Sequence, residues 1–212
     1  MFDGERLIQH IIKQRYFEEE ISNEVNLSYS DNQVTVTTDY LTLVYTLNSE
    51  GYASQCVYSL SSQNRIYQFS YSAEGYLTGI VENIDNREYS STSLTYENGD
   101  ITSISSKMNG LENKFIYEPG EESSTYHLPC LGLLEIHPLT FHIEALYAGL
   151  LGKDPRHFTI RSCPAGSNDE KTVYSYGFDK KGNPSRMICQ TTYAGGQASY
   201  YPYTRNISIS FE

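Results

Sequence analysis

The residue types best suited to chemistry gather between residues 126 and 165. Four of the five histidines lie there: His127, His137, His142 and His157. Two histidines bind one metal ion from a helix when they are four residues apart, because that spacing puts them on one face. His137 and His142 are five residues apart, which separates them by roughly 140° around a helix axis. The spacing predicts no metal site and no cofactor.

The same segment contains two candidate nucleophiles, Cys130 and Cys163, and the carboxylate of Glu144. Neither cysteine has the local signature of a cysteine-dependent enzyme, and the sequence contains no Gly-x-Ser-x-Gly motif. We therefore predict no catalytic residue and expect that the protein is not an enzyme. One alternative stays open, a hydrolase in which residues 126–165 form the lid of an active site.

The four cysteines are far apart and include no Cys-x-x-Cys pair. This spacing argues against a zinc ribbon and against a thioredoxin-like redox site. Four cysteines allow three pairings, and a disulfide between Cys130 and Cys163 stays open. Cys56 and Cys189 fall on apolar positions of predicted strands, so we expect both to be small core side chains.

The composition excludes several classes of protein. The 212 residues include 20 tyrosines and no tryptophan, only 19% are charged, and the formal net charge is −11. Such a composition is typical of β-sheets and excludes a helical bundle. The negative charge disfavours binding to nucleic acid or to anionic lipid headgroups. The sequence contains no run of 18 apolar residues, so we predict no membrane-spanning helix. Its first residues do not have the pattern of a signal peptide. We therefore expect that the chain is either cytosolic or has lost an export segment.

A repeat organises the chain. Gly51, Gly75 and Gly99 follow one another at intervals of 24 residues, and Gly182 has a similar context. Three of these glycines end a three-residue polar link, which suits a type I turn followed by a glycine with positive φ. Gly99 instead follows Asn98, the strongest signal for a two-residue type I′ turn. The repeat predicts successive β-hairpins.

Two details of the repeat make finer predictions. Asn48, Ser72 and Asp179 begin the longer links, where their side chains can accept a backbone N–H. The two apolar positions after each glycine, such as Ala53 and Cys56, are three residues apart. A regular strand would send them to opposite faces, so we expect either a bulge beside the turn or burial of both faces.

Two segments depart from the alternating strand pattern. Residues 5–20 fit either an amphipathic helix or a buried strand. Residues 138–152 predict a helix, with Pro138 in its first turn and Gly152 just after its end. The expected fold is therefore mainly β, a large curved antiparallel sheet or open barrel built from successive hairpins, with one short helix packed on or in it.

We expect a single β domain over residues 1–212. Residues 1–125 contain the hairpin repeats, residues 126–165 an irregular and helical insertion, and residues 166–212 a final hairpin and a terminal strand. The hairpin at residues 178–187 resembles the Tyr-Asp repeat of Rhs proteins.

A broader resemblance covers residues 5–212. The Arg6-Leu-Ile start, the run of Tyr-containing hairpins, the segment TyrAlaGlyLeuLeuGlyLysAspProArgHisPhe at 147–158 and the Tyr-rich terminal strand resemble secreted, lipid-anchored Bacteroidetes proteins of unknown function with a porin-like β fold. The resemblance implies a location at the cell envelope, periplasmic or outer-membrane-anchored, and a lipid anchor on a removed N-terminal segment. It brings no catalytic residues. Pro184 and Cys56 depart from the usual repeat.

The high number of tyrosines is the one feature of the composition that suggests a function. Its flat apolar face and polar tip suit the binding of sugars and peptides. The expected ligand-binding residues are Tyr52, Tyr76, Tyr200, Tyr201 and Tyr203, at positions predicted to be exposed. We expect a non-enzymatic cell-envelope protein that binds or scaffolds through this surface, with a glycan, a peptide or a lipid as ligand. The alternative is a carrier that holds a lipid or another apolar ligand inside the curved sheet.

Overall fold

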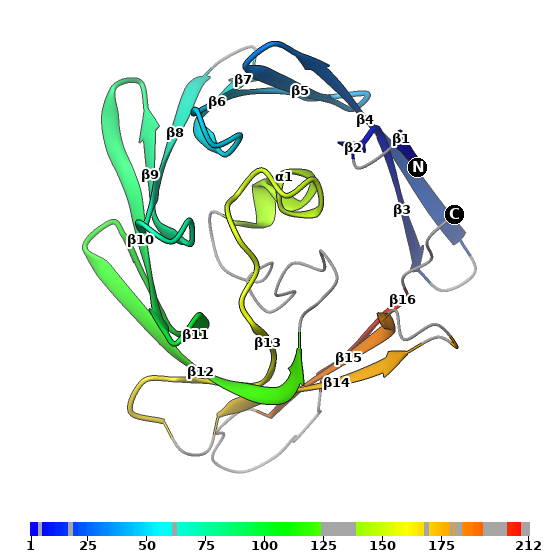
Figure 1. Ribbon diagram of the computed structural model, residues 1–212, viewed down its shortest axis with the longest axis vertical. Helices are drawn as coiled ribbons and strands as arrows, with labels where there is room; N and C mark the ends of the chain where they lie inside the picture. Colours follow the sequence, from blue (N-terminus) through cyan, green and yellow to red (C-terminus); the bar gives the residue numbers. More distant parts are fainter. Residues whose placement is uncertain are drawn as a thin grey trace. The chain divides into compact units, whose positions relative to one another are not determined.

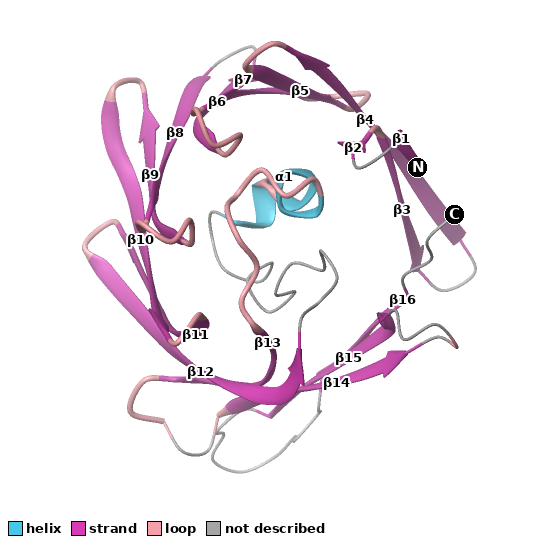
Figure 2. Ribbon diagram, in the orientation of Figure 1, coloured by secondary structure: helices cyan, strands magenta, loops and turns pink. Residues whose placement is uncertain are grey.

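The computed structural model describes residues 1–3, 6–16, 19–60, 63–123, 139–167, 170–178, 180, 184–192 and 203–208. This part of the chain is mainly β-structure with one short α-helix (Figure 2). The predicted fold class, an antiparallel sheet of successive hairpins with one short helix, is confirmed.

The elements follow one another as β1 Phe2–Asp3, β2 Arg6–Leu7, β3 Gln9–Tyr16, β4 Glu19–Ser30, β5 Gln33–Thr37, β6 Thr42–Leu47, β7 Ala53–Leu60, β8 Gln63–Tyr71, β9 Leu77–Ile84, β10 Arg87–Glu97, β11 Asp100–Met108, β12 Leu111–Ser123, the 3₁₀ turn η2 Leu139–Phe141, α1 Ile143–Tyr147, β13 His157–Pro164, β14 Lys171–Phe178, β15 Pro184–Thr192 and β16 Tyr203–Ser208. Strands β3 to β16 take their places in the sheet in chain order, and β1 pairs with β2.

The chain forms two compact units. The first contains Met1–Ser91 and Phe141–Lys153, and the second contains Thr92–Thr140 and Asp154–Glu212. The predicted division into residues 1–125, 126–165 and 166–212 stays a prediction.

In the first unit the strands β3 to β9 curve around α1, which lies on one face of their sheet (Figure 1). That face is buried and carries alternate residues of each strand, as the period of two requires. Its apolar members are Val25, Leu27, Val34, Val36, Leu43, Tyr45, Ala53, Cys56, Tyr67, Phe69, Leu77 and Ile80. Leu146 and Leu150, from α1 and the turn after it, are buried as well.

In the second unit, residues 92–97 of β10 and the strands β11 to β16 contribute to the core. Its buried apolar side chains are Leu94, Ile101, Ile104, Tyr117, Leu139, Phe158, Tyr174, Met187 and Cys189. Polar pairs lie among them, including Ser162 and Tyr174, whose hydroxyl oxygens are 3.0 Å apart. The core positions of Cys56 and Cys189 are thus confirmed.

The turn glycines adopt the predicted backbone. Gly51, Gly75 and Gly99 have φ of 85°, 92° and 87°, and Asn98 has φ of 54°, as a type I′ turn requires. The strand register shifts beside Gly51 and beside Gly75. The predicted bulge is therefore present in these two repeats, and both apolar positions of each, Ala53 with Cys56 and Leu77 with Ile80, are buried. The turn at Gly182 and Asp179 lies outside the described residues.

The structure decides two local predictions. Of the two structures predicted for residues 5–20, the strand is correct, since β3 pairs with β4 from Gln9 to Tyr16. The predicted helix over 138–152 is wrong in length, because α1 covers only Ile143–Tyr147. Gly149 takes a left-handed φ of 69°. Beyond it the Leu150 carbonyl accepts the N–H of Ala53 and the Lys153 N–H donates to the Gly75 carbonyl, so the helix does not continue.

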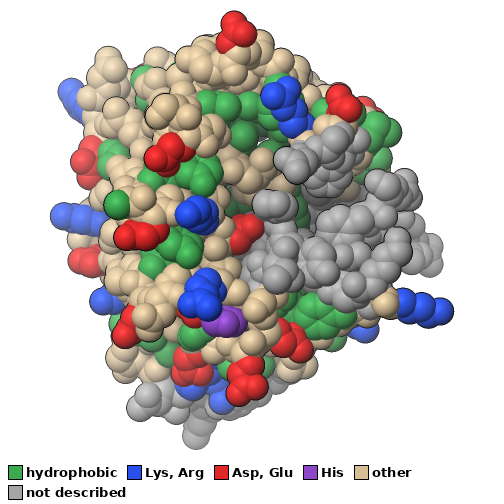
Figure 3. Space-filling view, viewed as in Figure 1, with side chains coloured by type: hydrophobic (Ala, Val, Ile, Leu, Met, Phe, Trp, Pro, Cys, Tyr) green, Lys and Arg blue, Asp and Glu red, His purple; other side chains and the backbone are tan. Residues whose placement is uncertain are grey.

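Acidic and basic side chains of the described residues are interspersed on the face shown in Figure 3. Within the residues described, no helix combines the length and apolar character needed to cross a membrane.

Candidate functional site

Two neighbouring turns of the first unit position the tyrosines that the sequence singled out. In the turn after β6, the side-chain oxygen of Asn48 accepts the N–H groups of Glu50 and Tyr52 at 3.0 and 2.9 Å. In the turn after β8, the Ser72 hydroxyl accepts the N–H groups of Glu74 and Tyr76 at 3.3 Å. The predicted role of Asn48 and Ser72 is confirmed, and both turns are held rigid by their own first residue.

The Tyr52 side chain crosses from its own turn to the next. Its ring lies against Tyr71, with centroids 5.3 Å apart and planes inclined by 32°. It also covers Gly75 so closely that a Cβ atom there would be 3.2 Å from the Tyr52 ring. Gly75 is therefore required by its positive φ and also by the ring above it.

The segment after α1 locks this arrangement. Leu150 accepts the backbone N–H of Ala53 at 2.7 Å, and Lys153 donates its own N–H to Gly75 at 2.9 Å. The Tyr71 hydroxyl donates to the Ala53 carbonyl at 2.7 Å. Burial raises the pKa of Tyr71, so its hydroxyl stays protonated and keeps this bond.

We call Tyr52, Tyr71, Glu74, Tyr76 and Lys153 the turn platform. Tyr52 is half-buried, and its hydroxyl makes no hydrogen bond to the described part of the chain. Glu74 and Lys153 are exposed. The Ser72 hydroxyl lowers the pKa of Glu74, and Lys153 adds to this effect. The platform thus combines an immobilised aromatic face with a free hydroxyl and two charges of opposite sign.

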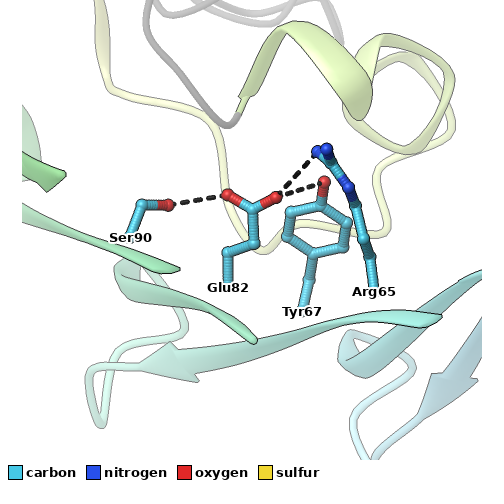
Figure 4. A network of polar contacts seen from close by, with 4 residues as sticks. All are labelled: Arg65, Tyr67, Glu82 and Ser90. Carbon is cyan, nitrogen blue, oxygen red and sulfur yellow. Dashed lines mark hydrogen bonds and ion pairs between the residues drawn. The ribbon is translucent and has the colours of Figure 1, made fainter. Parts of the chain in front are cut away.

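A second polar group lies on the buried face of the same unit. We call Tyr58, Arg65, Tyr67, Glu82 and Ser90 the polar cluster. Glu82 is completely buried, and its Oε1 atom accepts hydrogen bonds from Arg65 Nη1 and from the Tyr67 hydroxyl, both at 3.1 Å. Its Oε2 atom accepts the Ser90 hydroxyl at 2.8 Å. Figure 4 shows Glu82 between Ser90 on one side and Tyr67 with Arg65 on the other.

The charges in the polar cluster compensate one another. The Arg65 guanidinium carries the counter-charge of Glu82 and lies 6.0 Å from the centre of the Tyr58 ring. Burial and the negative charge of Glu82 raise the pKa of Tyr67, so Tyr67 remains a hydrogen-bond donor. A buried carboxylate is tolerated because it is paired and its oxygens accept several donors.

His142 joins the polar cluster to α1. The ring of His142 is fully buried and meets Tyr67 edge to face, with centroids 4.4 Å apart. Phe69 and Tyr45 lie at 5.2 and 5.8 Å, and the Tyr45 hydroxyl is 2.9 Å from His142 Nδ1. This aromatic cage fixes the start of α1 on the sheet.

Of the five tyrosines predicted to bind a ligand, Tyr52 and Tyr76 belong to the first unit. Tyr52 and Tyr76 lie on adjacent turns, but both are half-buried rather than exposed, and the Tyr52 ring is covered on one side by Tyr71. Tyr203 begins β16, and Tyr200 and Tyr201 lie outside the described residues.

Of the cysteines and histidines of the insertion, the structure describes Cys163, His142 and His157. Cys163 is a free, half-buried thiol, while Cys130, His127 and His137 lie outside the described residues. His157 pairs with Asp100. Among the described residues, no three His, Cys, Asp or Glu side chains are grouped so that they could hold a metal ion.

The polar cluster was not predicted. Arg65 and Glu82 are 17 residues apart, and each is one polar residue within an alternating strand. The one signal for Glu82 is its place in the pattern of β9, where it shares strand parity with the core residue Ile80.

Comparison with known protein families gives one match. Residues 3–186 match the family described as "Domain of unknown function (DUF4595) with porin-like fold". The chain belongs to this family. The porin-like fold expected from the sequence is thereby confirmed for this DUF4595 protein, while the lipid anchor and the Rhs resemblance stay predictions. Curated protein sequences contain no match.

A solved structure supports the same fold. The crystal structure of a porin-like protein from Bacteroides uniformis ATCC 8492 is similar to this DUF4595 chain with a TM-score of 0.84 and 28% sequence identity. The similarity covers 98% of this chain and 85% of the other.

Proposed function

We propose that this DUF4595 protein is a non-enzymatic binding protein of the cell envelope that holds a glycan on its turn platform. The observation that carries this proposal is the half-buried Tyr52 ring, held by Tyr71 and Gly75. An aromatic face that is already immobilised loses little conformational entropy when a sugar stacks on it. The free Tyr52 hydroxyl, Glu74 and Lys153 provide hydrogen-bonding groups beside that face for sugar hydroxyls.

The envelope location is supported by the likeness to a porin-like protein of a Bacteroides species and by the resemblance of the sequence to exported proteins. The absence of an enzymatic role is part of the proposal. We expect no turnover of ester, peptide or glycoside substrates.

The observations favour the platform over an apolar carrier. In the first unit, the buried face beside Ala53 is covered by Leu150, and the face beside Tyr67 is covered by His142. Side chains of the protein itself therefore occupy surface that an apolar ligand would need. The hydrolase alternative requires a lid formed by residues 126–165. In the described part of that segment, residues 139–165, nothing favours a lid, since Leu150 and Lys153 are hydrogen-bonded to Ala53 and Gly75.

Binding of fluorescently labelled protein to an array of plant, mucin and bacterial glycans tests the proposal. For any glycan that the wild-type protein binds, Tyr52→Ala should weaken the affinity about tenfold. This is roughly the contribution of one aromatic contact. Tyr52→Phe separates the ring from its hydroxyl and should weaken binding less. Tyr40→Ala is the control, because Tyr40 is 87% exposed on a different turn.

Circular dichroism and urea unfolding would establish that each variant is folded. Wild-type protein that retains no glycan, or equal loss in Tyr40→Ala and Tyr52→Ala, would contradict the platform as a glycan site.

A further inference from the structure

Arg65 has more hydrogen-bonding capacity than the protein uses. A guanidinium group has five N–H donors. The described contact with Glu82 is a single bond from Nη1 to one carboxylate oxygen at 3.1 Å, not a two-bond fork. Arg65 Nε is buried and has no hydrogen-bond partner. The Arg65 side chain is still 22% exposed, so it is not sealed from solvent.

The position of the guanidinium is fixed from below. Glu82, which holds Arg65, is itself held by Tyr67 and Ser90. Because the carboxylate accepts hydrogen bonds at both oxygens, it cannot rotate away without leaving buried donors unpaired. Arg65 is therefore presented in one orientation, as a binding group must be.

Tyr58 completes the surroundings of this group. It lies directly opposite Arg65 across the β7–β8 pair, and its ring is beneath the guanidinium. Tyr58 is half-buried, and its hydroxyl makes no hydrogen bond to the described part of the chain. Two neighbouring side chains thus offer unused donors on one side of the sheet.

We propose that Arg65 and Tyr58 form a binding site for an oxyanion group, a carboxylate or a phosphate carried by a small ligand. Arginine suits such groups because its planar N–H edge matches two oxygens of the anion. Glu82 neutralises the guanidinium while the site is empty, so the buried charge is tolerated without the ligand. The site is separate from the turn platform and does not depend on the function proposed for it.

Nuclear magnetic resonance of the arginine Nε–H groups tests this proposal directly. Sodium phosphate and sodium glucuronate are the two probes, and sodium chloride at equal ionic strength is the reference. Arg65→Lys identifies the Arg65 signal by its loss. We expect that signal to shift in a saturable manner with at least one probe. A response to phosphate alone would indicate a phosphate ester as the ligand. A response to glucuronate alone would indicate an acidic sugar or another carboxylate, and a response to both probes would indicate a general oxyanion site.

Arg161 provides the matched control. It also pairs with a glutamate, Glu118, through Nη1, and its Nε is likewise without a hydrogen-bond partner. Its carboxylate partner is exposed, however, and not held in a buried network. The Arg161 signal should therefore move no further with the probes than with chloride. Since the net charge of −11 repels anions in general, saturation at Arg65 would be specific.

Two further variants separate the contributions of the Tyr58 hydroxyl and of the Glu82 charge. Tyr58→Phe preserves the ring and should weaken probe binding severalfold, about one neutral hydrogen bond. Glu82→Gln removes the negative charge that competes for Arg65 and should strengthen probe binding. A shift of Arg65 that fails to saturate with either probe, or that chloride reproduces, would overturn the proposal.

Discussion

The Asp100 carboxylate binds His157 at two points, accepting the backbone N–H at Oδ1 and lying beside ring Nδ1 at Oδ2, both at 2.8 Å. An ionised carboxylate only accepts hydrogen bonds, so Nδ1 carries the proton. Asp100 directly follows the Gly99 turn, and His157 begins β13. One buried side chain therefore anchors the start of a strand to a turn 57 residues away in the sequence.

Replacing Asp100 should destabilise the fold. Asp100→Ala leaves the N–H of His157 without its acceptor, and we expect a loss of about 2 to 3 kcal/mol in the free energy of unfolding. Asp100→Asn keeps one acceptor and should lose less. Urea unfolding measures both. Asp39→Ala removes an exposed aspartate and should change stability by less than about 0.5 kcal/mol; equal effects at the two positions would refute the anchoring role.

Removing one charged partner from the polar cluster should lower the free energy of unfolding strongly. Glu82→Leu leaves Arg65 charged and poorly paired, and we expect a loss of about 3 to 5 kcal/mol. Removing both partners in Arg65→Met with Glu82→Leu should cost less than the sum of the single changes. Thermal or urea unfolding completes the double-mutant cycle.

The exposed pair of Arg161 and Glu118 is the control for that cycle, because its Nη1–Oε1 distance is similarly short at 2.9 Å. Glu118→Leu should cost no more than about 1 kcal/mol. Additive effects of the two changes at Arg65 and Glu82 would show that the buried pair is not coupled.

The two turn glycines should respond differently to the same change. Gly51 and Gly75 both have positive φ, but a Cβ atom at Gly51 would meet nothing within 4 Å, whereas at Gly75 it would meet Tyr52. Gly51→Ala should cost about 1 to 2 kcal/mol for backbone strain alone. Gly75→Ala should cost more and should alter the near-ultraviolet circular dichroism of tyrosine. Equal losses in the free energy of unfolding at Gly51 and Gly75 would mean that the Tyr52 ring moves aside without cost.

Alkaline pH should destabilise the protein. Burial raises the pKa of the Cys56 thiol to about 12 and raises the pKa of Tyr45, Tyr67 and Tyr71. Above about pH 9 the unfolded chain releases these protons while the folded chain retains them. The unfolded state then binds fewer protons, so the free energy of unfolding falls as pH rises from about 9 to about 12.

Each such group contributes a slope of about 1.4 kcal/mol per pH unit once it is ionised in the unfolded chain. Urea midpoints at pH 8, 9.5 and 10.5 measure the slope. Cys56→Ala should make it shallower, and an unchanged slope would show that the thiol is not protected in the folded protein.

The hairpins could be predicted from the sequence because their determinants are local. A glycine with positive φ, an Asn-Gly pair and a side-chain acceptor such as Asn48 act within four residues. The spacing of the apolar positions left either a bulge or burial of both faces open, and the register shifts beside Gly51 and Gly75 decide for the bulge. The predicted helix is too long because the end of α1 depends on distant partners, the backbone groups of Ala53 and Gly75 that bond to Leu150 and Lys153.

The sequence by itself determined a ribbon of antiparallel hairpins with tyrosines at the turns, since period-two patterning and turn chemistry need no partner from elsewhere in the chain. Only the tertiary structure decided what those side chains meet. Strand register brings Arg65 opposite Tyr58 and Tyr67 opposite Glu82, and it lays Tyr52 over Gly75. Both candidate sites depend on these contacts between strands and turns, which no periodicity within one strand can specify.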